Sequence, residues 1–286
     1  MKRRDFIKAI SAGVVLGTVD PFSFVSATQL FPMSKGFSLS DHDGSVKDYL
    51  HKMQNFDQPH SGDIHLAKEQ LSVLYSCVSR LKRLQRTVGH GNFHLLSFDD
   101  GMAIARNYSK VGKFSRRELD FLERIFYTDS EEYGFWGDKP ISKMTTNIKK
   151  SEVVKIPRTG NYLYRGVPQE MYEKVRKHVG DKLYLTSGIR GVMKQLYLFL
   201  NKANKNKGNL SLASRSLAPP GYSFHGISDF AVGQIGYGAL NFTGRFTTTE
   251  VFKKLDALDY VSIRYPKDNL KGVRFEPWHI KVYPGI

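Results

Sequence analysis

The chain of 286 residues is 41% hydrophobic and 13% aromatic, which is enough to bury one good core, or one core with a smaller companion, and excludes a disordered chain. Its formal net charge of +16 favours an anionic partner, although the excess of basic residues could equally serve solubility alone. Cys77 is the only cysteine, so the chain cannot form an intramolecular disulfide.

The run from Lys2 to Lys8, KRRDFIK, resembles a twin-arginine export signal. An apolar stretch over residues 9–19 follows, and residues 25–27, Val-Ser-Ala, offer the small side chains of a cleavage site. The stretch is shorter than the ~20 apolar residues that a membrane span needs. We therefore expect residues 1–27 to be removed after export, which leaves a periplasmic protein without a stable membrane span.

Residues 28–65 are rich in Ser, Asp, His and Gly and predict a loose N-terminal segment. A helical region over residues 66–155 follows. Apolar residues recur with a helical period over residues 66–84, and Ser115 with Glu118 three residues later predicts the start of a second helix. We expect these helices to serve as scaffold.

Residues 156–286 have a different pattern. Short strands are predicted at 182–186, 230–232, 260–265 and 279–282, and helices at 191–204 and 251–258. Helices followed by strand-rich sequence predict an α+β fold, in which flanking helices cover a small antiparallel sheet.

Two short segments of this C-terminal part combine residues that bind metals. Glu276 and His279 lie in Phe-Glu-Pro-Trp-His near the C-terminus, and His225 and Asp229 lie about fifty residues upstream. Two imidazoles and one carboxylate suit a catalytic zinc ion, because three protein ligands leave a fourth position for the water to be activated. We expect a mononuclear zinc site with His225, Asp229 and His279 as ligands and Glu276 as the general base.

The same segments resemble the VanY-type zinc D-alanyl-D-alanine carboxypeptidases, whose signature is S-x-H-x-x-G-x-A-x-D followed by E-x-W-H. Residues 276–279 match the second half, and Ser223 and His225 match the opening of the first. The middle departs from the family, because the position seven residues after the histidine is Val232. A shortened loop would make Asp229 the ligand, and the alternative is that this aspartate only forms a turn.

A third match is Ser187-Gly188-Ile189-Arg190 with Gln195 downstream, which resembles the family's S-G-x-R…Q element. The resemblance covers roughly residues 160–286 and implies that Arg190 anchors the substrate, with Ser187 and Gln195 also in the binding site. A guanidinium suits this role because it offers a planar, permanently charged, bidentate partner to a free C-terminal carboxylate.

The resemblance implies a zinc-dependent carboxypeptidase that removes the terminal D-alanine of peptidoglycan stem peptides. An endopeptidase of the same fold and a non-catalytic cell-wall binding module are the alternatives. The export signal moves the expected anionic partner from nucleic acid to the cell envelope. The sequence leaves open the oligomeric state and the preference for D,D or L,D bonds.

Overall fold

The computed structural model describes residues 48–283, which lie within one compact unit. The expected export signal and the first part of the expected loose segment lie outside the described residues. Within the described range, no helix has both the length and the apolar character that crossing a membrane requires.

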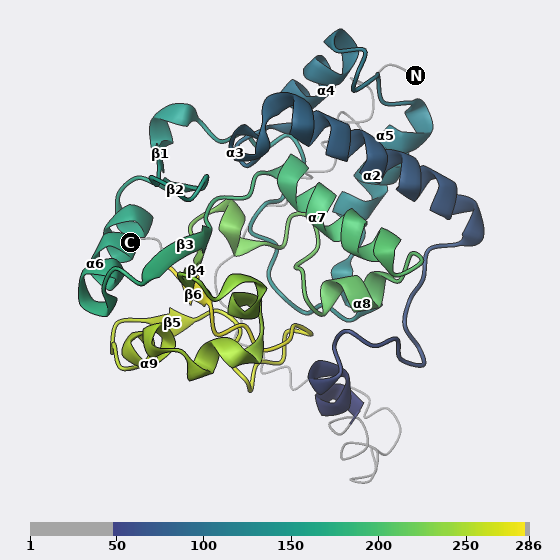
Figure 1. The fold of residues 1–286 in the computed structure, drawn as a ribbon. Coiled ribbons are helices and arrows are strands. Elements are labelled where there is room, and N and C mark those ends of the chain that lie inside the picture. The colour runs from purple at the N-terminus through teal and green to yellow at the C-terminus, as the bar shows by residue number, and fades with distance from the viewer. Residues whose placement is uncertain (1–47, 284–286) are drawn as a thin grey trace, which may run out of the picture. The chain divides into compact units, whose positions relative to one another are not determined.

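The helical part is built around two long helices, α2 (Lys68–Val88) and α7 (Val192–Lys205), which lie side by side (Figure 1). Leu81 of α2 and Leu196 and Phe199 of α7 are completely buried in a shared core. Shorter helices surround this pair, namely α3 (His90–Phe93), α4 (Phe98–Asn107), α5 (Arg116–Tyr127), α8 (Leu210–Ser214) and the 3-10 turns η2 (Ser130–Tyr133) and η3 (Lys150–Glu152). The core of the helical region therefore includes α7 from the C-terminal part.

Ser115 caps α5 in the predicted way. Its Oγ accepts a hydrogen bond from the backbone N–H of Glu118 at 3.2 Å, while the Glu118 carboxylate accepts from the backbone N–H of Ser115 at 2.7 Å. The same carboxylate accepts hydrogen bonds from Ser76 and Arg80 on α2. One capping residue thus also joins α5 to α2.

The antiparallel sheet has the strand order β3 (Leu183–Ser187), β4 (Phe230–Gln234), β6 (His279–Lys281), β5 (Ser262–Ile263). Helices α6 (Val167–Val179) and α9 (Glu250–Asp256) pack against apolar side chains of the sheet, including Phe230, Val232 and Ile280. The 3-10 turns η4 (Phe224–Gly226), η5 (Gly238–Phe242) and η6 (Gly244–Thr248) and a two-stranded ladder of β1 (Val153–Lys155) and β2 (Tyr162–Tyr164) complete the fold. The α+β prediction is confirmed.

The register of the sheet selects which residues share a face. Ser187 and His279 both pair directly with Ala231 on β4. Paired residues of an antiparallel ladder point to the same side, and neighbours along a strand point to opposite sides. Ser187, Ala231 and His279 therefore share the face opposite to Phe230 and Ile280, which is the face that carries the candidate site.

The described end of the N-terminal segment is held in place, in contrast to the loose segment that composition predicted. The guanidinium of Arg215 forms a buried two-bond ion pair with Asp63, at 2.7 and 3.0 Å, and donates to the carbonyl groups of Phe56 and Gln58. Arg215 lies more than 150 residues away in the sequence, so local composition could not indicate this contact. Its consequence is that Phe56 stays at the candidate site.

We expect Asp63→Asn to lower the free energy of unfolding by about 3 kcal/mol, because it leaves the buried Arg215 charge uncompensated. Burial alone would raise the pKa of Asp63, but hydrogen bonds from Arg215 and Asn209 outweigh it and lower the pKa to about 2. The ion pair therefore stabilises the fold above about pH 4 and loses its effect as the pH falls towards 2. Urea denaturation of both proteins from pH 7 downwards should show the difference shrinking below pH 4, and a difference independent of pH would contradict this assignment.

Candidate functional site

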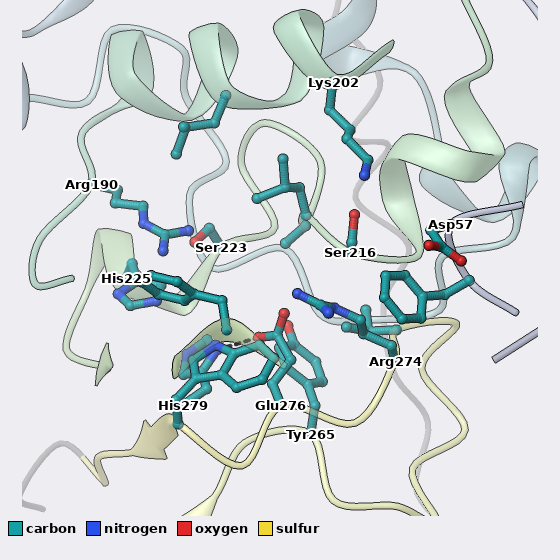
Figure 2. A pocket seen from close by; sticks show the side chains of 17 residues that line it. Asp57, Arg190, Lys202, Ser216, Ser223, His225, Tyr265, Arg274, Glu276 and His279 are labelled. Atoms are coloured by element: carbon teal, nitrogen blue, oxygen red, sulfur yellow. Dashed lines mark hydrogen bonds and ion pairs between the residues drawn. The ribbon is translucent and has the colours of Figure 1, made fainter. Parts of the chain in front are cut away.

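A cavity of about 470 Å³ lies between the site face of the sheet, helix α7 and the N-terminal segment. Its lining is rich in charged and aromatic side chains (Figure 2), which include Asp57, Arg190, Lys202, His225, Tyr265, Arg274, Glu276, Trp278 and His279. The structure thus gathers Arg190, His225, Glu276 and His279, which the sequence had placed in three separate segments.

The two histidines lie next to each other with their ring centroids 4.4 Å apart. His225, on the η4 turn before β4, has its Nδ1 2.9 Å from the carbonyl oxygen of Gly188. A carbonyl only accepts, so Nδ1 carries the proton and Nε2 keeps a free lone pair. Burial, followed by the charge of Arg190, lowers the pKa of His225 well below its usual value and keeps this imidazole neutral.

His279 is oriented by Glu276. Its Nδ1 lies 3.0 Å from a carboxylate oxygen of Glu276, and its buried Nε2 makes no hydrogen bond to the described residues. Burial alone would lower the pKa of His279, but interactions with Asp229 and Glu276 outweigh it and raise the pKa. Glu276, the expected general base, therefore lines the cavity, but its carboxylate is already hydrogen-bonded to Nδ1 of His279, on the side of the ring opposite to Nε2.

Glycine is required next to this pair. A Cβ at Gly188 would clash with the backbone carbonyl of Tyr162. The close approach of the two backbones lets the chain turn after β3, so that Gly188 presents its carbonyl to His225 and Arg190 follows two residues later. The Ser-Gly-x-Arg element therefore builds one wall of the site.

Asp229 is fully engaged below the site. The guanidinium of Arg264 donates to both of its oxygens, at 2.6 and 2.9 Å, and the backbone N–H of Val282 donates at 2.9 Å. One oxygen of Asp229 lies 3.2 Å from Nε2 of His279, but without hydrogen-bond geometry. The Asp229 side chain is completely buried and does not line the cavity.

The residues present do not fit the complete zinc site that the sequence predicted. Nε2 of His225 and Nε2 of His279 make no hydrogen bond to a described residue, and both imidazoles have the Nδ1 hydrogen bond that orients a metal-binding imidazole. A cation at Asp229 would lie beside the positive guanidinium of Arg264. Between residues 48 and 283, no three His, Cys, Asp or Glu side chains form a group that could hold a metal ion. The arrangement therefore does not support Asp229 as the third ligand.

Arg190 points its guanidinium into the cavity beside His225 and Ser223 (Figure 2). Its Nε donates to Ser187 Oγ at 2.9 Å, whereas its terminal nitrogens make no hydrogen bond or ion pair within the described part of the chain. Burial lowers the pKa of Arg190 to about 10, so the group stays charged at neutral pH. Ser187 thus supports Arg190 from behind and does not line the cavity.

Gln195 also lies outside the cavity lining. Its amide donates to the carbonyl oxygen of Ala218, and its own Oε1 is buried without a partner among the described residues. The expected contact of Gln195 with substrate is therefore not seen at the cavity. Its observed contact fixes the loop that contains Ala218, which does line the cavity.

Arg274 and Tyr265 are among the cavity residues that the sequence did not identify. Arg274 stacks on the rings of Phe56 and Trp278, with its Cζ 4.3 and 4.8 Å from the ring centroids, and its buried Nε has no hydrogen-bond partner in the described range. Burial raises the pKa of Tyr265, so its phenol stays protonated beside His279. Arg274 is two residues before Glu276, so its place near the site could be inferred from the motif. Its stacking on Phe56 could not, because the two residues lie far apart in the sequence.

We expect Arg264→Met to lower the free energy of unfolding by about 3–5 kcal/mol, because it leaves the buried Asp229 carboxylate without its cation. The matched control is Arg116→Met, which breaks an exposed ion pair with Asp120 and should change stability little. Urea denaturation at pH 7 measures both variants. Equal small effects would mean that Arg264 and Asp229 do not form this pair in solution.

Residues 167–285 match the family model VanY, described as D-alanyl-D-alanine carboxypeptidase, which confirms the resemblance over this part of the chain. A structure of the LdcB LD-carboxypeptidase is similar at 22% identity and a TM-score of 0.38, over 48% of this chain and 70% of that one. A Zn(II) complex of a mutant vancomycin resistance D,D-pentapeptidase VanY is similar at 24% identity and a TM-score of 0.37, over 46% of this chain and 78% of that one. Comparison with curated proteins finds no match.

Proposed function

We propose that the cavity binds the free carboxyl end of a peptidoglycan stem peptide, with D-alanyl-D-alanine as the expected end group, because residues 167–285 match the VanY family model. The observation that carries this proposal is the half-buried guanidinium of Arg190, whose terminal nitrogens face the cavity without a hydrogen bond or ion pair among residues 48–283. A charge that is partly removed from water loses solvation, and a partner of opposite charge restores that loss. A terminal carboxylate would supply a bidentate partner.

A second cation supports an anionic peptide rather than a neutral one. Arg274 makes no ion pair with any residue that the structure describes, and Lys202 points towards the cavity from α7 (Figure 2). Stem peptides offer carboxylates beyond the terminal one. Arg190 is proposed to hold the terminal carboxylate, and Arg274 is placed to attract another acidic group of the same peptide.

Hydrolysis of the terminal D-alanine, as a zinc-dependent D-alanyl-D-alanine carboxypeptidase, is the second candidate function. It is favoured by the Nε2 atoms of His225 and His279, which make no hydrogen bond to a described residue, and by the carboxylate of Glu276 at the cavity. Recognition of the peptide end is better supported than hydrolysis, because Asp229 does not complete the set of three zinc ligands. The proposed location is the periplasm, on the ground of the twin-arginine pattern in residues 1–27.

Arg190→Lys should weaken binding of a D-alanyl-D-alanine-terminated pentapeptide by about 10-fold or more, because lysine keeps the charge but loses the two parallel hydrogen bonds. Calorimetric titration in metal-free buffer measures this, with the C-terminally amidated peptide as the matched ligand and the exposed Arg245→Lys as the control variant. The wild type should prefer the free acid, and Arg190→Lys should lose most of that preference. Equal binding of both peptides by the wild type would eliminate recognition of a free end and favour the endopeptidase alternative.

Glu276→Gln tests the second candidate. The amide can still accept the hydrogen bond of His279, but it cannot take up a proton. Any release of D-alanine by the wild type, assayed with added zinc, should therefore fall by ~10²-fold or more in the variant. Undiminished release would exclude Glu276 as the base, and no release by the wild type would leave recognition as the function.

A further inference from the structure

We propose that Ala231 occupies the place of the third metal ligand, so that the chain can offer a metal ion only His225 and His279. The inference concerns this chain's own ligand set and does not depend on which peptide the cavity binds. Asp229 was expected to be the third ligand, but its oxygens already accept hydrogen bonds from Arg264 and from the backbone N–H of Val282.

The register of the central strand identifies Ala231. It pairs directly with His279 on β6 and with Ser187 on β3, so its methyl group shares the site face of the sheet with the imidazole. Directly opposed residues have Cβ atoms roughly 4.5–5.5 Å apart. A carboxylate at this position could therefore approach the same metal as an imidazole of His279, whereas a methyl group cannot coordinate.

Glu276 cannot serve as the third metal ligand in place of Asp229. The Glu276 carboxylate bonds the Nδ1 edge of His279, which is the opposite edge from the free Nε2. Position 229 lies in the turn before β4, where its backbone N–H bonds to the carbonyl of Phe224. The turn directs the Asp229 carboxylate to Arg264, which directly follows β5, and β4 then presents residue 231 at the site face.

The proposal predicts weak zinc binding by the wild type and strong zinc binding by Ala231→Asp. Loss of an outer-shell partner alone typically lowers metal affinity 10- to 100-fold, so gain of a whole ligand should raise zinc affinity by more than about 100-fold. Ala231→Asn is the matched control, because it has nearly the same size without the charge, and it should gain far less. Zinc affinity is measured by competition with a chromogenic chelator, and stoichiometry by elemental analysis.

Folding of the variants is measured separately. Ala231 is completely buried, so an unpaired carboxylate there should lower the melting temperature of the metal-free variant, and zinc should restore it. If Ala231→Asp does not fold, the wild type still decides the matter through its own zinc affinity and the effect of Asp229→Asn on it. Weak wild-type binding that Asp229→Asn leaves unchanged supports the proposal.

Tight binding of one zinc ion by the wild type, lost in folded Asp229→Asn, would overturn the proposal and restore Asp229 as a ligand. A folded Ala231→Asp with unchanged zinc affinity would also overturn it. Peptide binding is measured in metal-free buffer, so failure of this inference and failure of the proposed recognition by Arg190 give different results.

Discussion

The antiparallel pairing of the central strand β4 with both β3 and β6 is the constraint on which the site depends. It fixes Ser187, Ala231 and His279 in one row on the same face of the sheet. The turn that follows β3 then delivers Arg190, and the turn that precedes β4 delivers His225. A shift of one residue in either pairing would move His279 or Arg190 away from the cavity, because side chains alternate between the two faces.

Charge is distributed unequally above and below this row. Below it, Asp229 and Arg264 neutralise each other in a buried pair. In the cavity above it, Arg190 and Arg274 form no ion pair with a described residue, although Glu276 lies close enough to act on the pKa of both, and burial at this place costs stability that an anionic ligand would offset. Two half-buried cations without ion pairs at one cavity favour an anionic ligand there. The same arrangement explains why the aspartate closest to the histidines is unsuited to a metal ion.

Local sequence patterns predicted much of the fold. The capping box at Ser115, the apolar period of the first long helix and the approximate positions of α7 and β6 all follow from spacings within a few turns or one strand. That Arg190, His225 and His279 lie together was predicted from three motifs that occur in the same order in the VanY family. Local composition also predicted a loose segment up to residue 65, whereas residues 48–65 are bound to the domain.

The remaining features depend on contacts across the fold. Arg264 is 35 residues from Asp229, and nothing near either residue indicates that they pair. Arg215 donates a hydrogen bond to the carbonyl of Phe56, and the Arg274 guanidinium stacks on the Phe56 ring. The place of Ala231 could not be deduced from motif spacing, because spacing had pointed to Asp229 and only the strand register shows which residue faces His279.

The central claim is that Arg190 receives a terminal carboxylate in this cavity. A crystal structure of the protein with a D-alanyl-D-alanine-terminated peptide, grown without metal, tests it most directly. The account predicts the terminal carboxylate within about 2.7–2.9 Å of both terminal nitrogens of Arg190, with the peptide leaving past Arg274. An ordered peptide whose carboxylate lies elsewhere, with Arg190 unoccupied, would contradict the account.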